Sequence, residues 1–195
     1  DLGVGGDLSA LHGHKRAALI IGGIILALVV IAIVLYNNLV TLRNRVGNAW
    51  DQVDVQLQRR LDLIPNLVET VKGYTAHERG ALAEVTAART SVMEASTPEA
   101  KMAADNALTG TLKSLFAVAE AYPDLKASAN YQQLQSQLAE TEDKISYMRQ
   151  SYNDTVMRYN TAIQTFPGLL FSGIFKPFEG YDAAPAASQA PSVSF

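Results

Sequence analysis

The adjacent residues His77 and Glu78 come closest in this chain to a metal-binding or catalytic motif. A zinc protease of the His-Glu-x-x-His type needs a second histidine, which is missing here. A di-metal site in a helical bundle needs Glu-x-x-His, and Tyr74 stands where that glutamate would be. The sequence therefore predicts neither metal site. We interpret His77 as a partly exposed helical histidine.

Other patterns that could carry chemistry are also missing from the sequence. There is no Gly-rich phosphate loop and no Gly-x-Ser-x-Gly motif, and Ser172 has no histidine nearby in sequence. The chain has no cysteine, and its net charge of −3 gives no basic field for nucleic acid. We expect a protein that is not an enzyme, with no metal, no cofactor and no nucleic-acid partner.

Polar side chains recur at helical spacing in two segments. They are Asp62, Asn66 and Glu69 in the first, and Asn153 and Asn160 beside Tyr152 and Tyr159 in the second. Such a pattern indicates either a polar groove for a partner or hydrogen bonds between helices that fix their register. We favour the hydrogen bonds between helices.

Four arginines follow the apolar N-terminal segment: Arg43, Arg45, Arg59 and Arg60. Their side chains could contact anionic lipid headgroups, above all those of Arg43 and Arg45. Alternatively the arginines form solvated pairs with the acidic residues Asp51, Asp54 and Asp62. We favour the solvated pairs.

The last residues suggest one further contact. Val193 and Phe195 are apolar at the spacing that can add as a strand to a PDZ-type groove. We keep this as a possible partner-binding segment, with a disordered end as the alternative.

Residues 17–35 form an unbroken apolar stretch, with no charge between Arg16 and Arg43. The stretch is long enough, as a helix, to cross the hydrocarbon of a bilayer. No small-x-small cleavage site follows it, so we expect a retained single-pass anchor rather than a signal peptide. The flanking Lys and Arg residues are balanced, which leaves the orientation open.

Small residues within the anchor form two small-xxx-small pairs. The pairs are Ala18 with Gly22 and Gly23 with Ala27. Such pairs let membrane helices approach closely and would favour a homo-oligomer. The plainer interpretation is ordinary glycine and alanine in a membrane helix.

Beyond the anchor, apolar residues recur with steps of three and four, which is typical of one face of a helix. The first such stripe is Trp50, Val53, Leu57, Leu61, Ile64, Val68 and Val71. Pro65 predicts a kink or a brief break near residues 62–64, with a kink favoured. We expect the helix to continue to Thr90, with Gly73 and Gly80 as weak points.

Two more long helices are expected. Thr97, Pro98 and Glu99 are a helix-start signal, and this helix should end at Tyr122-Pro123. Its apolar face is Leu108, Leu112, Leu115, Ala119 and Tyr122. The third helix has a coiled-coil seam with a mean step of 3.5 residues. The seam is Tyr131, Leu134, Leu138, Thr141, Ile145, Met148, Tyr152, Val156, Tyr159, Ile163 and Phe166.

The predicted fold is all-α, with an N-terminal single-pass transmembrane helix followed by an antiparallel bundle of long helices. The expected organisation is a disordered tail at 1–16, the transmembrane helix at 17–35 and the bundle at 36–166. An aromatic segment at 167–182 should dock on the bundle or on the membrane interface, with a partner site as the less favoured alternative. Residues 183–195 should form a flexible tail rich in Ala, Pro and Ser.

Much of the chain after residue 36 resembles the LemA family. The runs that carry the resemblance are Leu42 to Val46, Asn48 to Leu57, Arg59 to Tyr74, Ala76 to Glu78, Asn106 to Gly110, Ala119 to Lys126, Tyr152 to Asp154, Tyr159-Asn160, Phe166-Pro167 and Pro191 to Phe195. The resemblance implies a bacterial inner-membrane protein with one span, an antiparallel bundle in the cytoplasm and no established enzymatic activity. It also implies membrane metalloproteases as frequent neighbours, and one branch of the family in magnetosome membranes.

The chain departs from the family pattern at two places. Residues 1–16 are longer than the usual N-terminus and carry positive charge, and the segment after Phe175 is shorter. Three roles follow as hypotheses. The first is a membrane-anchored scaffold or adaptor that acts through self-association or partner binding, with membrane lipid as a further contact. The second is a membrane-shaping protein, and the third is a regulator of a membrane metalloprotease.

Overall fold

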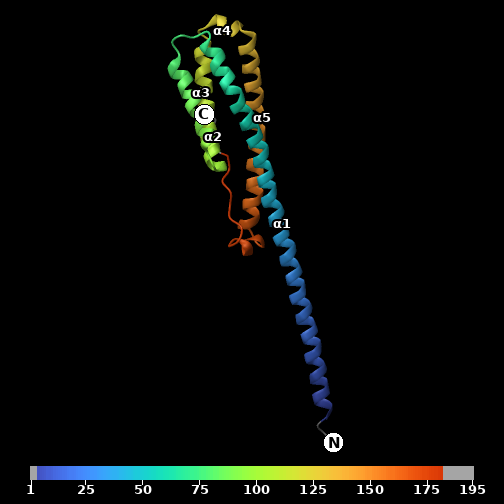
Figure 1. Cartoon of the computed structure of the whole chain (residues 1–195). Helices are drawn as coiled ribbons and strands as arrows, with labels where there is room; N and C mark the ends of the chain where they lie inside the picture. Colours follow the sequence, from blue (N-terminus) through green and yellow to red (C-terminus); the bar gives the residue numbers. More distant parts are fainter. Residues whose placement is uncertain (1–3, 182–195) are drawn as a thin grey trace, which may run out of the picture.

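The computed structural model describes the main chain of residues 4–181 and the side chains of residues 11–181. This part of the chain is all-α, as predicted, and contains no strand. Its elements, labelled in Figure 1, are α1 (Val4–Lys72), α2 (Arg79–Glu94), α3 (Pro98–Ala119), α4 (Pro123–Ala127), α5 (Ala129–Gln164) and the 3₁₀ turn η1 (Gly168–Phe171).

Helix α1 is a single helix of 69 residues, which at 1.5 Å per residue is about 100 Å long. Its N-terminal half extends away from the bundle (Figure 1), and its C-terminal half forms part of the bundle. Large apolar side chains between Leu19 and Val34 are 48% to 76% exposed all around the helix. The N-terminal half is long and apolar enough to cross a membrane, and it is the only such helix in the described residues.

The N-terminal residues differ from the expectation. Helix α1 begins at Val4, so residues 4–16 are helical where the sequence predicted a disordered tail. The physical reason is that an existing helix gains one hydrogen bond for each residue added, whereas starting a new helix is costly. Polar and Gly-rich composition therefore did not end the helix at the membrane segment.

A second difference lies after Lys72. The first helix ends there, and the predicted continuation to Thr90 is wrong. The N–H groups of Tyr74 and Thr75 both donate to the carbonyl oxygen of Val71, which closes the last turn at the weak point Gly73. The chain then reverses into α2. At Pro65, in contrast, α1 continues without a break.

The bundle consists of two antiparallel pairs that lie side by side (Figure 1). The C-terminal half of α1 packs along α5, and α2 packs along α3. The predicted stripe of α1 is buried from Val53 to Val71, and Trp50 is partly buried. The seam of α5 is also largely buried as predicted, but its last residue, Phe166, is 78% exposed.

The predicted helix start at Thr97 is confirmed. Thr97 Oγ1 accepts a hydrogen bond of 3.1 Å from the N–H of Ala100, and Pro98 is the first helical residue. Helix α3 ends at Ala119, slightly before the predicted end. Pro123 then begins the short helix α4, and Ser128 caps α5 through the N–H of Tyr131 at 3.3 Å.

Candidate functional site

Residues 172–181, which we call the C-terminal strap, return along the bundle after η1 (Figure 1). Phe175 and Tyr181 are 1% and 2% exposed. The ring of Phe175 lies 5.4 Å from that of Tyr36, and the ring of Phe178 lies 5.2 Å from that of Tyr159. Docking on the bundle, one of the two predicted fates of this segment, is therefore what the strap does.

Two asparagines of α5 hold the main chain of the strap. Asn160 donates to the carbonyl oxygen of Phe178 at 2.8 Å and accepts from the N–H of the same residue at 3.0 Å. Asn153 does the same with Tyr181, at 2.8 Å and 2.5 Å. Each side-chain amide thus forms the pair of hydrogen bonds that a neighbouring β-strand would form with one residue of an extended chain.

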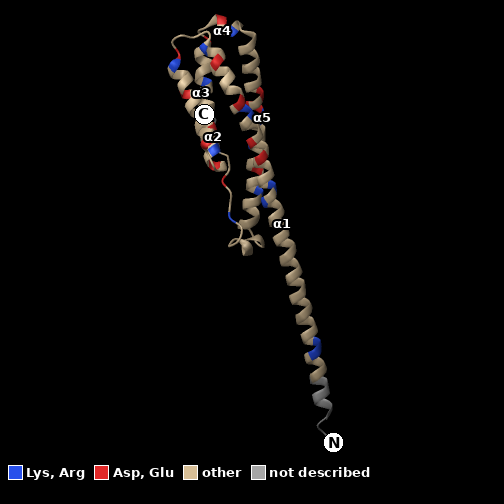
Figure 2. Cartoon of the chain, viewed as in Figure 1, with Lys and Arg blue, Asp and Glu red and all other residues tan. Residues whose placement is uncertain are grey.

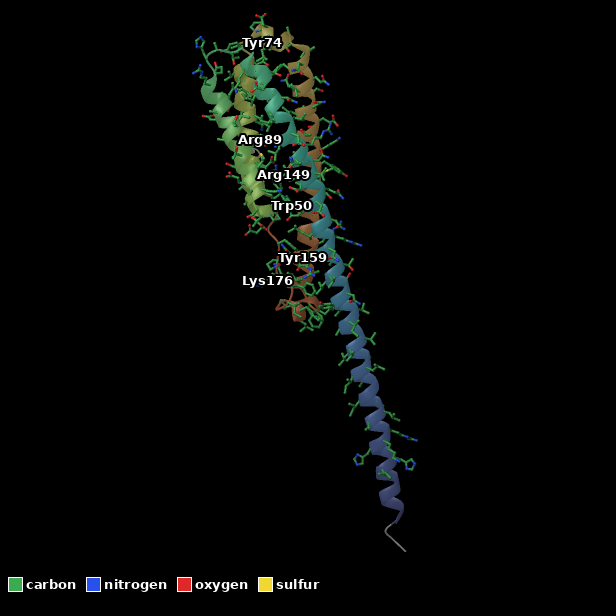
Figure 3. The ribbon with its side chains drawn as sticks, in the orientation of Figure 1. Trp50, Tyr74, Arg89, Arg149, Tyr159 and Lys176 are labelled. Carbon is green, nitrogen blue, oxygen red and sulfur yellow. The ribbon has the colours of Figure 1, made fainter. Side chains whose placement is uncertain are left out.

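The tyrosine before each asparagine on α5 also binds the strap, two residues before the partner of that asparagine. Tyr159 Oη donates to the carbonyl oxygen of Lys176 at 2.9 Å, and Tyr152 Oη contacts that of Glu179 at 3.4 Å. Figure 3 shows Tyr159 and Lys176 near each other at the lower end of the bundle. The predicted contact between helices is wrong for this repeat, because its partner is an extended segment.

The spacing of the repeat matches the geometry of its ligand. Equivalent residues of α5 are seven apart, which is about 10.5 Å of helix. Equivalent residues of the strap are three apart, and three residues of extended chain also span about 10 Å. Each Tyr-Asn pair of α5 therefore lies opposite an equivalent pair of strap residues.

Beneath the end of the strap lies a buried charge network. The Arg60 guanidinium, 3% exposed, contacts Asp105 Oδ1 at 2.5 Å, Thr109 Oγ1 at 3.0 Å and the carboxylate of Glu142. The hydroxyl of Tyr181 donates to the other oxygen of Asp105. The network connects α1, α3, α5 and the strap.

The environment of Tyr181 disfavours its phenolate. Burial raises the pKa of this phenol far above its ordinary value of 10.0, and the nearby carboxylate of Asp105 adds to the shift. Arg149 lies over the ring at 4.5 Å and acts in the opposite direction. Tyr181 is therefore a neutral hydrogen-bond donor at the end of the strap.

The arginines are paired differently from the expectation. Arg60 is buried against Asp105, which is also buried, and reaches the part-exposed Glu142, rather than pairing in solvent with a nearby aspartate. Arg59 reaches Glu140 of α5 at 3.6 Å. Asp54 pairs with Lys101 of α3 at 2.7 Å. The predicted partners were wrong because helix packing brings distant residues closer than sequence neighbours.

The other two arginines, Arg43 and Arg45, are exposed on α1 just after the apolar stretch. The Arg43 guanidinium lies 5.6 Å from the ring centre of Phe175. Their contact with lipid headgroups stays a prediction.

The polar face at Asp62, Asn66 and Glu69 is exposed, so it does not fix the register of helices. Asp62 accepts from Gln58 at 2.9 Å, and Glu69 lies 3.4 Å from Lys72, both on the same helix. The interpretation as hydrogen bonds between helices is therefore wrong for this face also. Glu140 and Lys144 of α5 also pair within one helix, at 2.7 Å.

The remaining predicted sites are not brought together. Ala18, Gly22, Gly23 and Ala27 are exposed on the extended half of α1, with space around both glycines. His77 is exposed in the turn before α2. Val193 and Phe195 lie outside the described residues. Within those residues no group of three His, Asp or Glu side chains could hold a metal.

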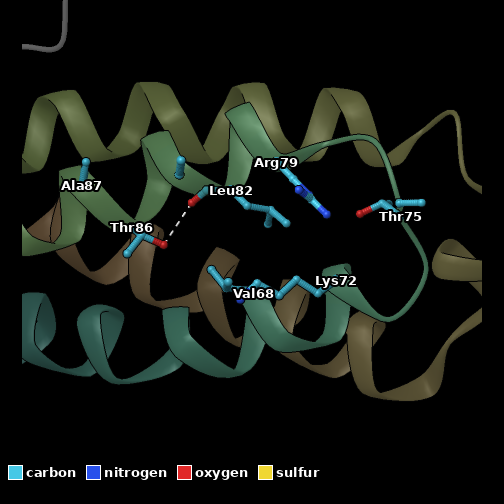
Figure 4. A pocket seen from close by; sticks show the side chains of 9 residues that line it. Val68, Lys72, Thr75, Arg79, Leu82, Thr86 and Ala87 are labelled. Atoms are coloured by element: carbon cyan, nitrogen blue, oxygen red, sulfur yellow. Dashed lines mark hydrogen bonds between the residues drawn. The ribbon is translucent and has the colours of Figure 1, made fainter.

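A groove of about 820 Å³ opens between the end of α1 and the start of α2 (Figure 4). Val68 and Leu82 form apolar parts of its lining, with Thr75 at one end. Lys72 and Arg79 are exposed at its edge. The sequence pattern gave no indication of this groove, because the turn at residues 73–78 creates it.

The fold is thus a helical bundle carried on one long helix that can cross a membrane. The chain belongs to the LemA family, whose model matches residues 49–195. It is 26% identical to magnetosome proteins MamQ 1 and MamQ 2 of Paramagnetospirillum magneticum, over 90% of this chain and 75% of each relative. It is 27% identical to protein LemA of Metamycoplasma hominis, over 67% of this chain and 60% of that protein.

Proposed function

We propose that this LemA-family membrane protein is a scaffold or adaptor that self-associates and holds partners at the membrane. The supporting observation is the continuity of α1, whose exposed apolar half and bundle half form one helix. A continuous helix fixes the position of the bundle relative to the bilayer. Such a link suits a protein that presents binding surfaces at a set height.

The chain offers two such surfaces, one on the bundle and one on the anchor. One is the groove between α1 and α2, which lies beyond the membrane segment by about 50 Å, counted from Leu35 to Val68. The other is the side of the anchor that carries Ala18 and Gly22, where Gly22 leaves space for a second helix. We also propose, from the family resemblance, that the bundle lies in the cytoplasm at the inner membrane of a bacterium.

Disulfide cross-linking in native membranes tests the self-association, because the chain contains no other cysteine. A Gly22→Cys variant should form a cross-linked dimer. The matched control is Ile24→Cys, which lies about 200° away around the helix and should not cross-link. Equal cross-linking of the two variants, or none from either, would contradict a specific anchor interface.

A membrane-shaping role is the second candidate. It is favoured by the exposed apolar side chains at the membrane end of the bundle and by relatives named as magnetosome proteins. Vesicles that keep their shape at high protein coverage would argue against it. Regulation of a membrane metalloprotease follows from the family resemblance alone and stays a prediction.

A further inference from the structure

Four large apolar side chains around η1 face away from the bundle. They are Phe166, Leu169, Leu170 and Ile174, which are 78%, 50%, 72% and 64% exposed and which we call the apolar tip. The turn that carries them is fixed in place, because Gly168 is buried and Phe175 is 1% exposed. A fixed turn with four large exposed apolar side chains within nine residues indicates a surface with a partner.

The position of the tip identifies that partner. The apolar stretch of residues 17–35 is about 28 Å long as a helix, close to the thickness of bilayer hydrocarbon. Tyr36 is the next residue and so lies at the membrane interface, where tyrosine is enriched. Its ring lies 6.1 Å from that of Phe171 and 5.4 Å from that of Phe175, which brings the turn to the same depth.

The charges at this end of the bundle are of one sign. Residues 36–50 carry Arg43 and Arg45, and residues 155–178 carry Arg158 and Lys176, without one acidic residue in either range. All four cations are exposed. Figure 2 shows the acidic residues higher in the bundle, away from the half of α1 that extends into the membrane. Exposed cations beside an apolar tip suit a surface of anionic lipid.

We infer that the apolar tip is a second membrane contact, which inserts into the interface of an anionic bilayer while the four cations contact the headgroups. The bundle then stands on the bilayer at two places, the membrane helix and the tip. This inference goes beyond the proposed scaffold function and holds whether or not the protein self-associates.

Site-directed fluorescence of the full chain in nanodiscs tests the inference. The chain has no cysteine, so Leu170→Cys and Ile174→Cys each accept one fluorophore. The matched control is Tyr147→Cys, which is 74% exposed and lies about 26 Å up α5 from Gln164, the end of the helix nearest the tip. Nanodiscs are made of phosphatidylcholine with or without phosphatidylglycerol. Quenching is measured with nitroxide-labelled lipid and with aqueous iodide.

The lipid nitroxide should quench the labels at 170 and 174, and iodide should quench the label at 147. Phosphatidylglycerol should increase the quenching of the labels at 170 and 174 by the lipid nitroxide. In an Arg158→Gln, Lys176→Gln variant, phosphatidylglycerol should not increase that quenching. Iodide quenching at 170 as strong as at 147 would overturn the inference. Protection of the label at 170 from both quenchers would also overturn it, because protein rather than lipid would then cover the tip.

Discussion

Arg89 Nε donates a hydrogen bond of 2.9 Å to the main-chain carbonyl oxygen of Leu61. Leu61 lies four residues before Pro65, so its carbonyl is the one that proline leaves without an N–H donor in the helix. A side chain of α2 therefore supplies the missing donor of α1. This contact explains how α1 satisfies its main chain at Pro65.

Arg89→Met should destabilise the protein by about 1–3 kcal/mol, because the Leu61 carbonyl then loses its partner in a partly buried place. In a Pro65→Ala background the same change should cost much less, since alanine restores the helical donor. Denaturation in detergent measures the free energy of unfolding of the single and double variants. Arg158→Met, at an exposed arginine, is the control. An equal loss in both backgrounds would show that Arg89 does not compensate for Pro65.

Removing one asparagine should release the strap locally. Asn160→Leu loses both hydrogen bonds to Phe178, and two bonds at about 0.5–1.5 kcal/mol each predict exchange of that amide faster by about tenfold or more. Residue-resolved hydrogen exchange measures this change. Asn130→Leu, which removes only a surface bond to Thr70, should leave the strap protected. Unchanged exchange at Phe178 would contradict the clamp.

The charge network predicts that removing Arg60 alone costs more stability than removing Arg60 and Asp105 together. Arg60→Met should cost about 3–5 kcal/mol, because Asp105 stays buried without its cation. Adding Asp105→Leu should recover part of the loss, since the uncompensated charge is then gone. Urea denaturation measures the free energy of unfolding of the single and the double variant. Further loss in the double variant would mean that Asp105 contributes through Tyr181 more than it costs as a charge.

The raised pKa of Tyr181 predicts a pH dependence with a definite sign. Because the folded pKa exceeds the ordinary value of 10.0, the contribution of this phenol to stability is complete below pH 10.0 and is lost as the pH rises toward the folded pKa. Stability above pH 10.0 should fall less steeply in Tyr181→Phe, by up to about 1.4 kcal/mol per pH unit. Identical slopes in denaturation at several pH values would contradict the assignment.

Two glycines should respond in opposite ways to alanine. A Cβ at Gly168 would lie 1.9 Å from the carbonyl oxygen of Ala162, so Gly168→Ala must displace η1. Gly110 in α3 has open space around it, and Gly110→Ala should stabilise the protein by about 0.5–1 kcal/mol. Thermal denaturation compares the pair. A neutral Gly168→Ala would show that η1 packs less closely than described.

Periodicity predicted the helices and their buried faces, because burial of an apolar stripe is a local property of sequence. The seams of α1 and α5 and the cap at Thr97 are examples. The reversal at Gly73 was missed because glycine is tolerated inside helices and only the packing of α2 decides its role. The helical residues 4–16 were missed because composition does not record propagation from a neighbouring helix.

The charge network could not be predicted in the same way. Arg60 and Asp105 are 45 residues apart, and no local pattern distinguishes them from solvated charges. The strap site did leave a signal, the Tyr-Asn pair repeated after seven residues. That repeat was visible, but its spacing suggested a neighbouring helix, and an extended segment meets the same spacing with three residues.

The unbroken path of α1 gives the anchor control over direction as well as height. Each residue of an α-helix turns the chain by about 100°. One residue added between Leu35 and Leu39 would therefore rotate the whole bundle by about 100° about the axis of α1. The anchor would contact lipid as before, but neighbouring bundles would face one another through a different side. Orientation in the plane of the membrane is thus encoded in the count of residues at a single junction.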